Sequence, residues 1–169
     1  MKIVSFYADP DGRGYFKAAA LRLMEQCRNL GLDYDISEEN FGPDWIDNER
    51  AKARFILRKF NELREPFIWL DSDCRIMRHI DFAIKADWGV YLREDGKPHD
   101  FVHYIGDVHR NRQFIERWVA AIEAQGRGSH TAFISLFDEL NSEILPARYF
   151  ELGLSDSPSK LKYFRESES

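Results

Sequence analysis

Two acidic residues follow a short apolar run near the middle of the chain, in the sequence PFIWLDSD at 66–73. One residue separates Asp71 from Asp73, so a turning backbone can direct both carboxylates at one ion. Carboxylate oxygens are hard ligands that suit Mg²⁺ or Mn²⁺. Such an ion would bridge two phosphate oxygens and neutralise charge on a departing diphosphate. The alternative is a loop in which Asp71 caps a turn and Asp73 faces water, because Asp-x-Asp alone is common.

The elements around this motif predict an α/β domain. The run at 66–70 is typical of a central parallel strand covered on both faces, and ligands bind beyond the carboxyl ends of such strands. The other predicted strands are at 2–8, 32–36, 87–93 and 100–105. The predicted helices are at 15–30, 48–64, 79–86, 109–124 and 130–144. We therefore expect a mostly parallel central sheet with an antiparallel addition and helices on both faces.

The composition is that of a folded globular protein, since 44% of the 169 residues are hydrophobic and 31% are charged. The formal net charge is -5, which disfavours nucleic acid and anionic membranes as partners. Basic residues at 50–64 and 109–117 still leave a local nucleic-acid contact open. We expect one domain at 1–154 and a polar, flexible tail at 155–169.

Cysteine content and hydropathy favour a cytoplasmic location. The two cysteines, Cys27 and Cys74, are too few for a disulfide framework, and both are expected to be reduced. No segment offers the roughly 20 apolar residues that span a bilayer. Asp9 and Asp11 interrupt the N-terminal apolar run, which argues against a secretory signal.

The segment 51–80, AKARFILRKFNELREPFIWLDSDCRIMRHI, resembles the core of nucleotide-diphospho-sugar transferases of the GT-A fold. Lys52 and the pair Phe55-Ile56 match the family's helix, and Asp71-Ser72-Asp73 matches its Asp-x-Asp motif after a strand. The opening IVSFYAD is similar to the family's nucleotide-binding first strand. HYIGDVHRNRQFIERW resembles its later strand-then-helix unit. The chain departs from the family at Ala53, where Pro is usual.

The resemblance implies a single GT-A-like (Rossmann-like) domain and a metal-dependent glycosyltransferase. Its donor would be a nucleotide-diphosphate sugar, and its acceptor is not implied. Asp71 and Asp73 would hold Mn²⁺ or Mg²⁺. The residues implied to border the nucleotide, diphosphate or sugar are Ser5, Phe6, Tyr7, Asp35, Lys52 and Ser72. For Lys52 the alternative is a solvated basic face, because Arg50, Arg54, Arg58 and Lys59 stand on the same predicted helix.

A second departure concerns the catalytic base. The family tends to have Asp-Gln or Asp-Glu opening a helix before a Leu-Pro segment, where His130-Thr131 stands here. His130 is thus a candidate third metal ligand or general base, with a capping or surface histidine as the alternative. Asp107, after a predicted strand, and Asp138 are the other candidates for the base.

Three other functions stay open. A nucleotidyltransferase is the least favoured, because Asp11-Gly12-Arg13-Gly14 is too short for the known phosphate-binding fingerprints. A GT-A shell that binds a nucleotide-sugar without turnover would account for the missing late acidic pair. A phosphohydrolase of the haloacid dehalogenase type also places Asp-x-Asp after an apolar strand, with Asp71 as the nucleophile. That motif normally begins the domain and has Thr or Val where Arg75 stands, which disfavours this alternative.

Overall fold

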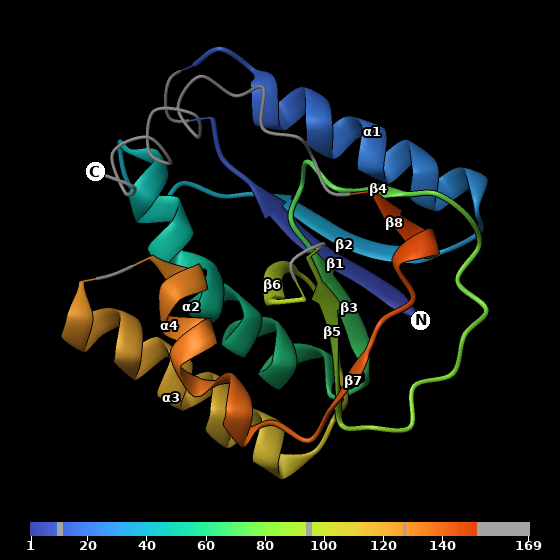
Figure 1. Cartoon of the computed structure of the whole chain (residues 1–169). Coiled ribbons are helices and arrows are strands. Elements are labelled where there is room, and N and C mark those ends of the chain that lie inside the picture. Colours follow the sequence, from blue (N-terminus) through green and yellow to red (C-terminus); the bar gives the residue numbers. More distant parts are fainter. Residues whose placement is uncertain (10–11, 94–95, 127, 152–169) are drawn as a thin grey trace.

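A six-stranded sheet lies at the centre of the computed structural model, which describes residues 1–9, 12–93, 96–126 and 128–151 (Figure 1). The strand order is β2-β1-β3-β6-β5-β7. The strands are β1 (Lys2–Tyr7), β2 (Asp33–Glu38), β3 (Phe67–Leu70), β5 (Trp88–Leu92), β6 (Pro98–Ile105) and β7 (Ser142–Ile144). A small second sheet pairs β4 (Arg75–Ile76) with β8 (Phe150–Glu151). The predicted tail at 155–169 lies outside the described residues.

Of the described strands in the central sheet, only β6 runs against the others. β1 is parallel to β2 and β3, and β5 is parallel to β7, whereas β6 is antiparallel to both β3 and β5. The edge at which β1, β3 and β5 end, here called the carboxyl edge, is therefore the edge at which β6 begins. The backbone shows this directly, because the Asp71 N–H donates to the Phe101 carbonyl at 2.9 Å.

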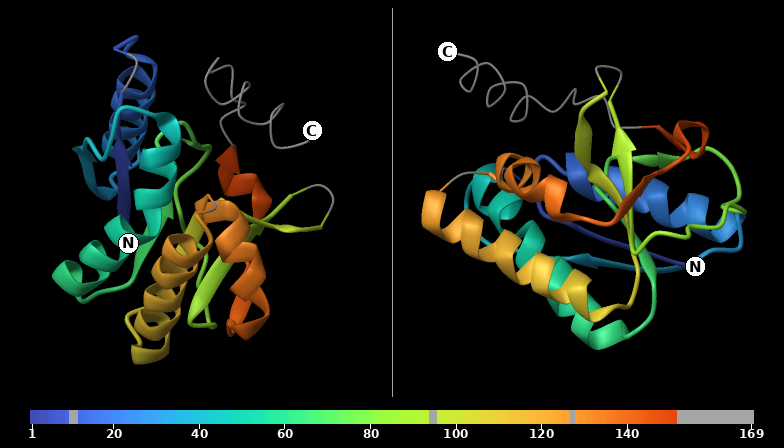
Figure 2. Two further views of the ribbon diagram at one scale, coloured as in Figure 1. Left: turned by 90° about the vertical axis from the view of Figure 1, so that its left-hand side faces the viewer. Right: turned by 60° about the horizontal axis from the view of Figure 1, so that its bottom comes forward.

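Helices cover both faces of the sheet, as the sequence predicts. One face carries α2 (Trp45–Leu63), α3 (His109–Gln125) and α4 (Ser129–Leu136), and the other carries α1 (Tyr15–Asn29) with the small sheet (Figure 1). Figure 2 shows the same layers from two further sides, with β5 and β6 joined as a hairpin. The predicted α/β class with an antiparallel addition is confirmed. No helix in the described part of the chain is long and apolar enough to cross a membrane.

The alternating faces of β3 explain why its four residues are all buried. Phe67 and Trp69 belong to the core beneath α2, and Ile68 and Leu70 belong to the core beneath α1. Alternation is a property of extended backbone. Asp71 continues the phase of Phe67 and Trp69, which directs its side chain toward α2.

Two predicted helices need correction. No helix forms over 79–86, where the chain runs without regular structure. Its apolar residues Ile80, Phe82 and Ile84 recur at every second position and pack in the core beneath α1, a spacing that suits an extended segment. The helix predicted at 130–144 ends at Leu136, because Ser142–Ile144 pairs with β5 as an edge strand.

Candidate functional site

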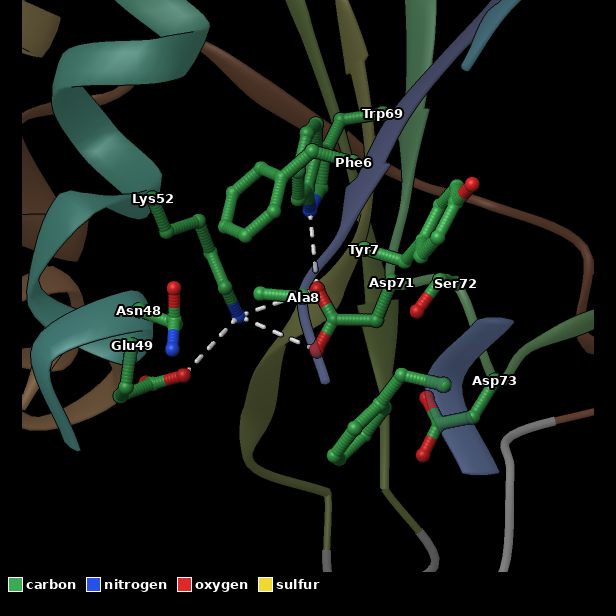
Figure 3. Close-up of a pocket in the computed structure, with 11 residues that line it drawn as sticks. Phe6, Tyr7, Ala8, Asn48, Glu49, Lys52, Trp69, Asp71, Ser72 and Asp73 are labelled. Atoms are coloured by element: carbon green, nitrogen blue, oxygen red, sulfur yellow. Dashed lines mark hydrogen bonds and ion pairs between the residues drawn. The ribbon is translucent and has the colours of Figure 1, made fainter. Parts of the chain in front are cut away.

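A pocket opens at the carboxyl edge of the sheet, where β1 ends and the loop after β3 begins. Its walls come from these two segments and from α1 and α2 (Figure 3). They combine aromatic rings, carboxylates and one lysine. The lining residues are Phe6, Tyr7, Ala8, Phe16, Asn48, Glu49, Lys52, Trp69, Asp71, Ser72 and Asp73.

Lys52 is the only cation among these lining residues. Its side chain, 3% exposed, places Nζ 3.0 Å from Asp71 Oδ1, 3.1 Å from Asp100 Oδ2 and 3.7 Å from Glu49 Oε2. Burial alone would lower the pKa of Lys52, but the charges of Asp100, Asp71 and Glu49 outweigh it and raise that pKa well above its usual range. The ammonium therefore stays charged. Figure 3 shows it between Glu49 and Asp71.

The position of Lys52 on α2 separates it from the other basic residues of that helix. Arg50, Arg54 and Arg58 are exposed, and Arg54 pairs on the surface with Glu123. For those three arginines a solvated basic face is the correct description. It is wrong for Lys52, which lies on the buried side of α2 beside Ala51 and Ala53.

Asp71 and Asp73 line the same pocket, but their surroundings differ. Trp69 Nε1 donates to Asp71 Oδ1 at 3.1 Å, and Lys52 donates to Asp71 Oδ2 at 3.2 Å. Both oxygens of Asp71 are thus engaged by the protein. Asp73 is 4% exposed and forms a separate part of the wall, after Ser72 (Figure 3).

Asp100 is a site residue that the sequence did not reveal. It is fully buried near the start of β6 and accepts a hydrogen bond from Lys52 Nζ on Oδ2. Burial raises the pKa of Asp100, but the charge of Lys52 and the hydrogen bond from His130 hold it well below the usual range. The hairpin turn at 96–98 was the available signal, because a hairpin makes 100–105 antiparallel and brings its first residues to the carboxyl edge.

His130 reaches this cluster from the start of α4. Its Nδ1 lies 3.0 Å from Asp100 Oδ1, and its backbone N–H donates to Glu49 Oε1 at 3.3 Å. Burial lowers the pKa of His130, but the hydrogen bond to Asp100 and the charge of Asp100 together outweigh this effect. The pKa of His130 is therefore raised above its usual value. His99 Nδ1 lies 3.7 Å from the same Asp100 oxygen, and burial lowers the pKa of His99 to about 4.

The structure does not assemble Asp71, Asp73 and His130 as one metal-ligating set. Within the described ranges, the one group of three or more such residues whose ligand atoms lie within 4.8 Å of one another is His99, Asp100 and His130. The reason is topological. The start of α4 lies beside the start of β6, so His130 meets Asp100, and Lys52 lies between Asp100 and Asp71.

The residues predicted to border the nucleotide divide into two groups. Phe6 and Tyr7 line the pocket, and the Phe6 ring packs 4.9 Å from Phe55 between ring centroids. Ser5 is fully buried and is not a lining residue. Asp35 pairs with Lys59 at 2.9 Å and is not a lining residue. Of these predicted positions, the end of β1 is therefore the part that faces the pocket.

Two predicted catalytic residues lie away from the pocket. Asp107 is exposed beyond Ile105, where β6 ends at the edge opposite the carboxyl edge. Asp138 is exposed in the 3-10 turn Phe137–Glu139, which precedes β7 at the same opposite edge. The direction of β6 and β7 thus separates both carboxylates from Asp71.

Comparison with known proteins supports the fold and gives no closer relationship. No family model matches the chain, and no curated protein matches its sequence. The fold does match 153 solved chains. One is a glycosyltransferase involved in the glycosylation of the major capsid of PBCV-1, with a TM-score of 0.68 and 10% identity, covering 99% of this chain and 98% of that chain. The chain thus shares its α/β fold with this glycosyltransferase.

Proposed function

We propose that the protein is a metal-dependent glycosyltransferase of the GT-A, Asp-x-Asp type that uses a nucleotide-diphosphate sugar donor. One observation carries this proposal: Asp71, Asp73 and Lys52 line one pocket together with Phe6 and Tyr7, at the ligand-binding edge of the sheet. The named activity of the structural neighbour supports it. The catalytic domain would correspond to 1–154.

The charges at the pocket fit a hard divalent cation such as Mn²⁺ or Mg²⁺. Glu49, Asp71 and Asp100 surround the single ammonium of Lys52, so negative charge is in excess before Asp73 is counted. A diphosphate entering this surrounding would be repelled unless a cation accompanied it. Asp71 and Asp73 would hold the ion from one wall of the pocket, with Asp73 as the direct ligand that the family resemblance implies. The ion would supply neutralisation of the diphosphate charge.

The protein's own groups would orient the donor in the pocket. Phe6, Tyr7 and Phe16 offer flat apolar surface for a nucleobase. Lys52 would present its charged ammonium to the diphosphate, and the surrounding carboxylates hold that ammonium in place before substrate arrives. In the reaction, the bond from the anomeric carbon to the diphosphate oxygen breaks. A bond to an acceptor hydroxyl oxygen forms, the electron pair of the broken bond stays on the departing diphosphate, and the hydroxyl proton is released to solvent.

The position of Asp71 disfavours the phosphohydrolase alternative. A nucleophilic carboxylate needs a free oxygen directed at substrate, whereas Asp71 Oδ1 accepts from Trp69 and both its oxygens contact Lys52. Asp107 and Asp138 lie at the opposite edge, so neither can serve as the base for an acceptor bound at the pocket.

Release of nucleoside diphosphate from a panel of sugar-nucleotides, with Mn²⁺ or with a chelator, tests the proposal. We expect Mn²⁺-dependent release that Asp73→Asn lowers at least about 100-fold, the scale of losing one electrostatic stabiliser. Asp107→Asn, an exposed carboxylate at the opposite edge, is the matched control and should keep full activity. Binding without release would identify the inactive nucleotide-sugar-binding shell. A phosphorylated Asp71 trapped during turnover would identify the phosphohydrolase.

A further inference from the structure

Beside the pocket, three side chains converge that are not among its lining residues. His99 and Asp100 come from the start of β6, and His130 comes from the first turn of α4. One potential ligand atom from each lies within 4.8 Å of the others. Both histidines lie close to the same oxygen of Asp100: Oδ1 is 3.0 Å from His130 Nδ1 and 3.7 Å from His99 Nδ1.

These separations suit a small metal ion. Tetrahedral zinc with ligand bonds of about 2.0–2.1 Å places its ligand atoms about 3.4 Å apart. The distances of 3.0 and 3.7 Å from Asp100 Oδ1 to the two histidine nitrogens lie on either side of that value. The Nδ1 atom of His99 is buried and has no hydrogen-bond partner among the residues that the structure describes. A buried polar atom of this kind normally has a partner, and a metal ion between the imidazole and the carboxylate would supply one.

The three ligand side chains determine which metals would bind. Two imidazoles and one carboxylate suit a divalent transition metal such as Zn²⁺, whereas Mg²⁺ prefers oxygen ligands alone. Three protein ligands leave a fourth position open. The side chain of His130 is 36% exposed, so solvent or a further ligand can reach the cluster from that side.

A second set of contacts orients these ligands, as is usual around metal sites. Asp100 Oδ2 is held by Lys52, which leaves Oδ1 directed at the two histidines. Glu49 accepts the backbone N–H of His130 and fixes the start of α4. The positive charge of Lys52 is offset by Asp71 and Glu49, so it does not by itself exclude a cation on the other side of Asp100.

We propose that His99, Asp100 and His130 bind a divalent transition metal of the Zn²⁺ type, at a site separate from Asp71 and Asp73. The site would fasten α4 to β6. It would also couple to the donor pocket, because Asp100 touches Lys52. The proposal goes beyond glycosyl transfer and does not depend on it. It replaces the role of His130 as a base, because a nitrogen bound to metal cannot accept a proton.

Titration of the protein with Co²⁺, a spectroscopic substitute for Zn²⁺, tests the site without an activity assay. We expect one equivalent of Co²⁺ to produce visible d–d absorption, and Zn²⁺ to abolish it by competition. Loss of a residue that only contacts a metal ligand weakens metal binding about 10- to 100-fold. His99→Gln and His130→Gln each remove a ligand and should weaken Co²⁺ binding by more than this. Circular dichroism and urea unfolding establish that each variant is folded.

Two controls make the outcome decisive. His109→Gln alters an exposed histidine at the start of α3 and should leave the Co²⁺ spectrum unchanged. Asp73→Asn should also keep the Co²⁺ band while losing Mn²⁺-dependent donor turnover, which separates failure of this site from failure of the proposed function. Absence of the band in the wild type, or its survival in folded His99→Gln protein, would overturn the assignment. Should His130→Gln fail to fold, His99→Gln alone decides.

Discussion

The two edges of the central sheet use similar residues for different purposes. At the opposite edge, Asn111 donates to the carbonyls of Asp87 and Gly106 at 2.7 and 2.8 Å, and Arg110 pairs with Asp87 at 3.1 Å. These contacts satisfy loop backbone and neutralise charge. At the carboxyl edge, several carboxylates meet the single ammonium of Lys52 and leave charge unneutralised. The contacts at the opposite edge stabilise the loops there, and the excess negative charge at the carboxyl edge can bind a ligand.

The difference follows from strand direction and not from residue type. Asp100 and Asp107 lie on or next to the same strand, β6. Asp100, near its start, is buried against Lys52, and Asp107, beyond its end, is exposed. Because β6 runs against its neighbours, its start meets the end of β3. A carboxylate is thus part of the site only when its strand delivers it to the carboxyl edge.

Replacing Lys52 should have the largest effect on stability. In Lys52→Met the carboxylates of Asp71 and Asp100 lose their buried partner, and we expect the free energy of unfolding to fall by about 3–5 kcal/mol. Urea denaturation measures this. Arg54→Met is the matched control on the same helix. Its pair with Glu123 is exposed, so its loss should cost less than about 1 kcal/mol. Equal losses in both variants would contradict a buried charge cluster at this edge.

His103, between the two edges on β6, should make the protein sensitive to acid. Burial is the main reason that its pKa falls from 6.5 to about 3, with Asp100, Lys52, His99 and His130 as its charged or titratable neighbours. The folded protein therefore resists protonation that the unfolded chain accepts. His103 stabilises the fold fully above pH 6.5, and this contribution declines by about 1.4 kcal/mol per pH unit as the pH falls toward 3.

His103→Asn tests that contribution. Asn retains an acceptor for the hydrogen bond that Trp88 Nε1 donates to His103 Nδ1 at 3.2 Å, but it does not titrate. Between pH 6.5 and 4, we expect the unfolding free energy of the variant to fall less steeply with decreasing pH than that of the wild type. The slope should be smaller by about 1.4 kcal/mol per pH unit, the value for one proton. An unchanged slope would show that His103 is accessible to protonation in the folded state.

Asn111→Ala examines the opposite edge. Asn111 is 1% exposed, and removal of its side-chain amide leaves the Asp87 and Gly106 carbonyls without these donors. We expect a loss of about 1–3 kcal/mol in unfolding free energy, with nucleotide binding unchanged. Reduced binding in a folded Asn111→Ala protein would mean that the two edges are not independent.

Asp107→Ala should have the smallest effect. The residue is exposed beyond the end of β6, and surface substitutions of this kind change stability by less than about 0.5 kcal/mol. Donor turnover should equal that of the wild type. A large drop in turnover would restore Asp107 as a catalytic residue and refute the separation of the edges.

The sequence predicted much of the fold because hydrophobic periodicity is local. The strand at 66–70, the helix at 109–124 and the α/β class are confirmed. The segment 79–86 was predicted wrongly, because Ile80 and Phe82 are held by packing against a distant part of the sheet and not by local preference. Boundaries at the C-terminal end likewise depend on the pairing of β7 with β5.

The candidate site was only partly predictable, for a related reason. Asp71, Asp73 and Lys52 stand within one continuous segment, so the family pattern could identify them together. Asp100 and His99 reach the site because β6 is antiparallel to β3, a long-range pairing that no local motif records. A register irregularity between β5 and β6, where Val90 pairs with His103 and Tyr91 with His99, further alters this end of β6.

The central claim is that the carboxyl-edge pocket binds a nucleoside diphosphate through a cation held by Asp73. Calorimetric titration of nucleoside diphosphates into the protein, with and without Mn²⁺, tests it most directly. We predict binding of at least one nucleoside diphosphate that requires Mn²⁺, is lost in Asp73→Asn and is retained in Asp107→Asn. Equal affinity without Mn²⁺, or undiminished affinity in Asp73→Asn, would contradict the account.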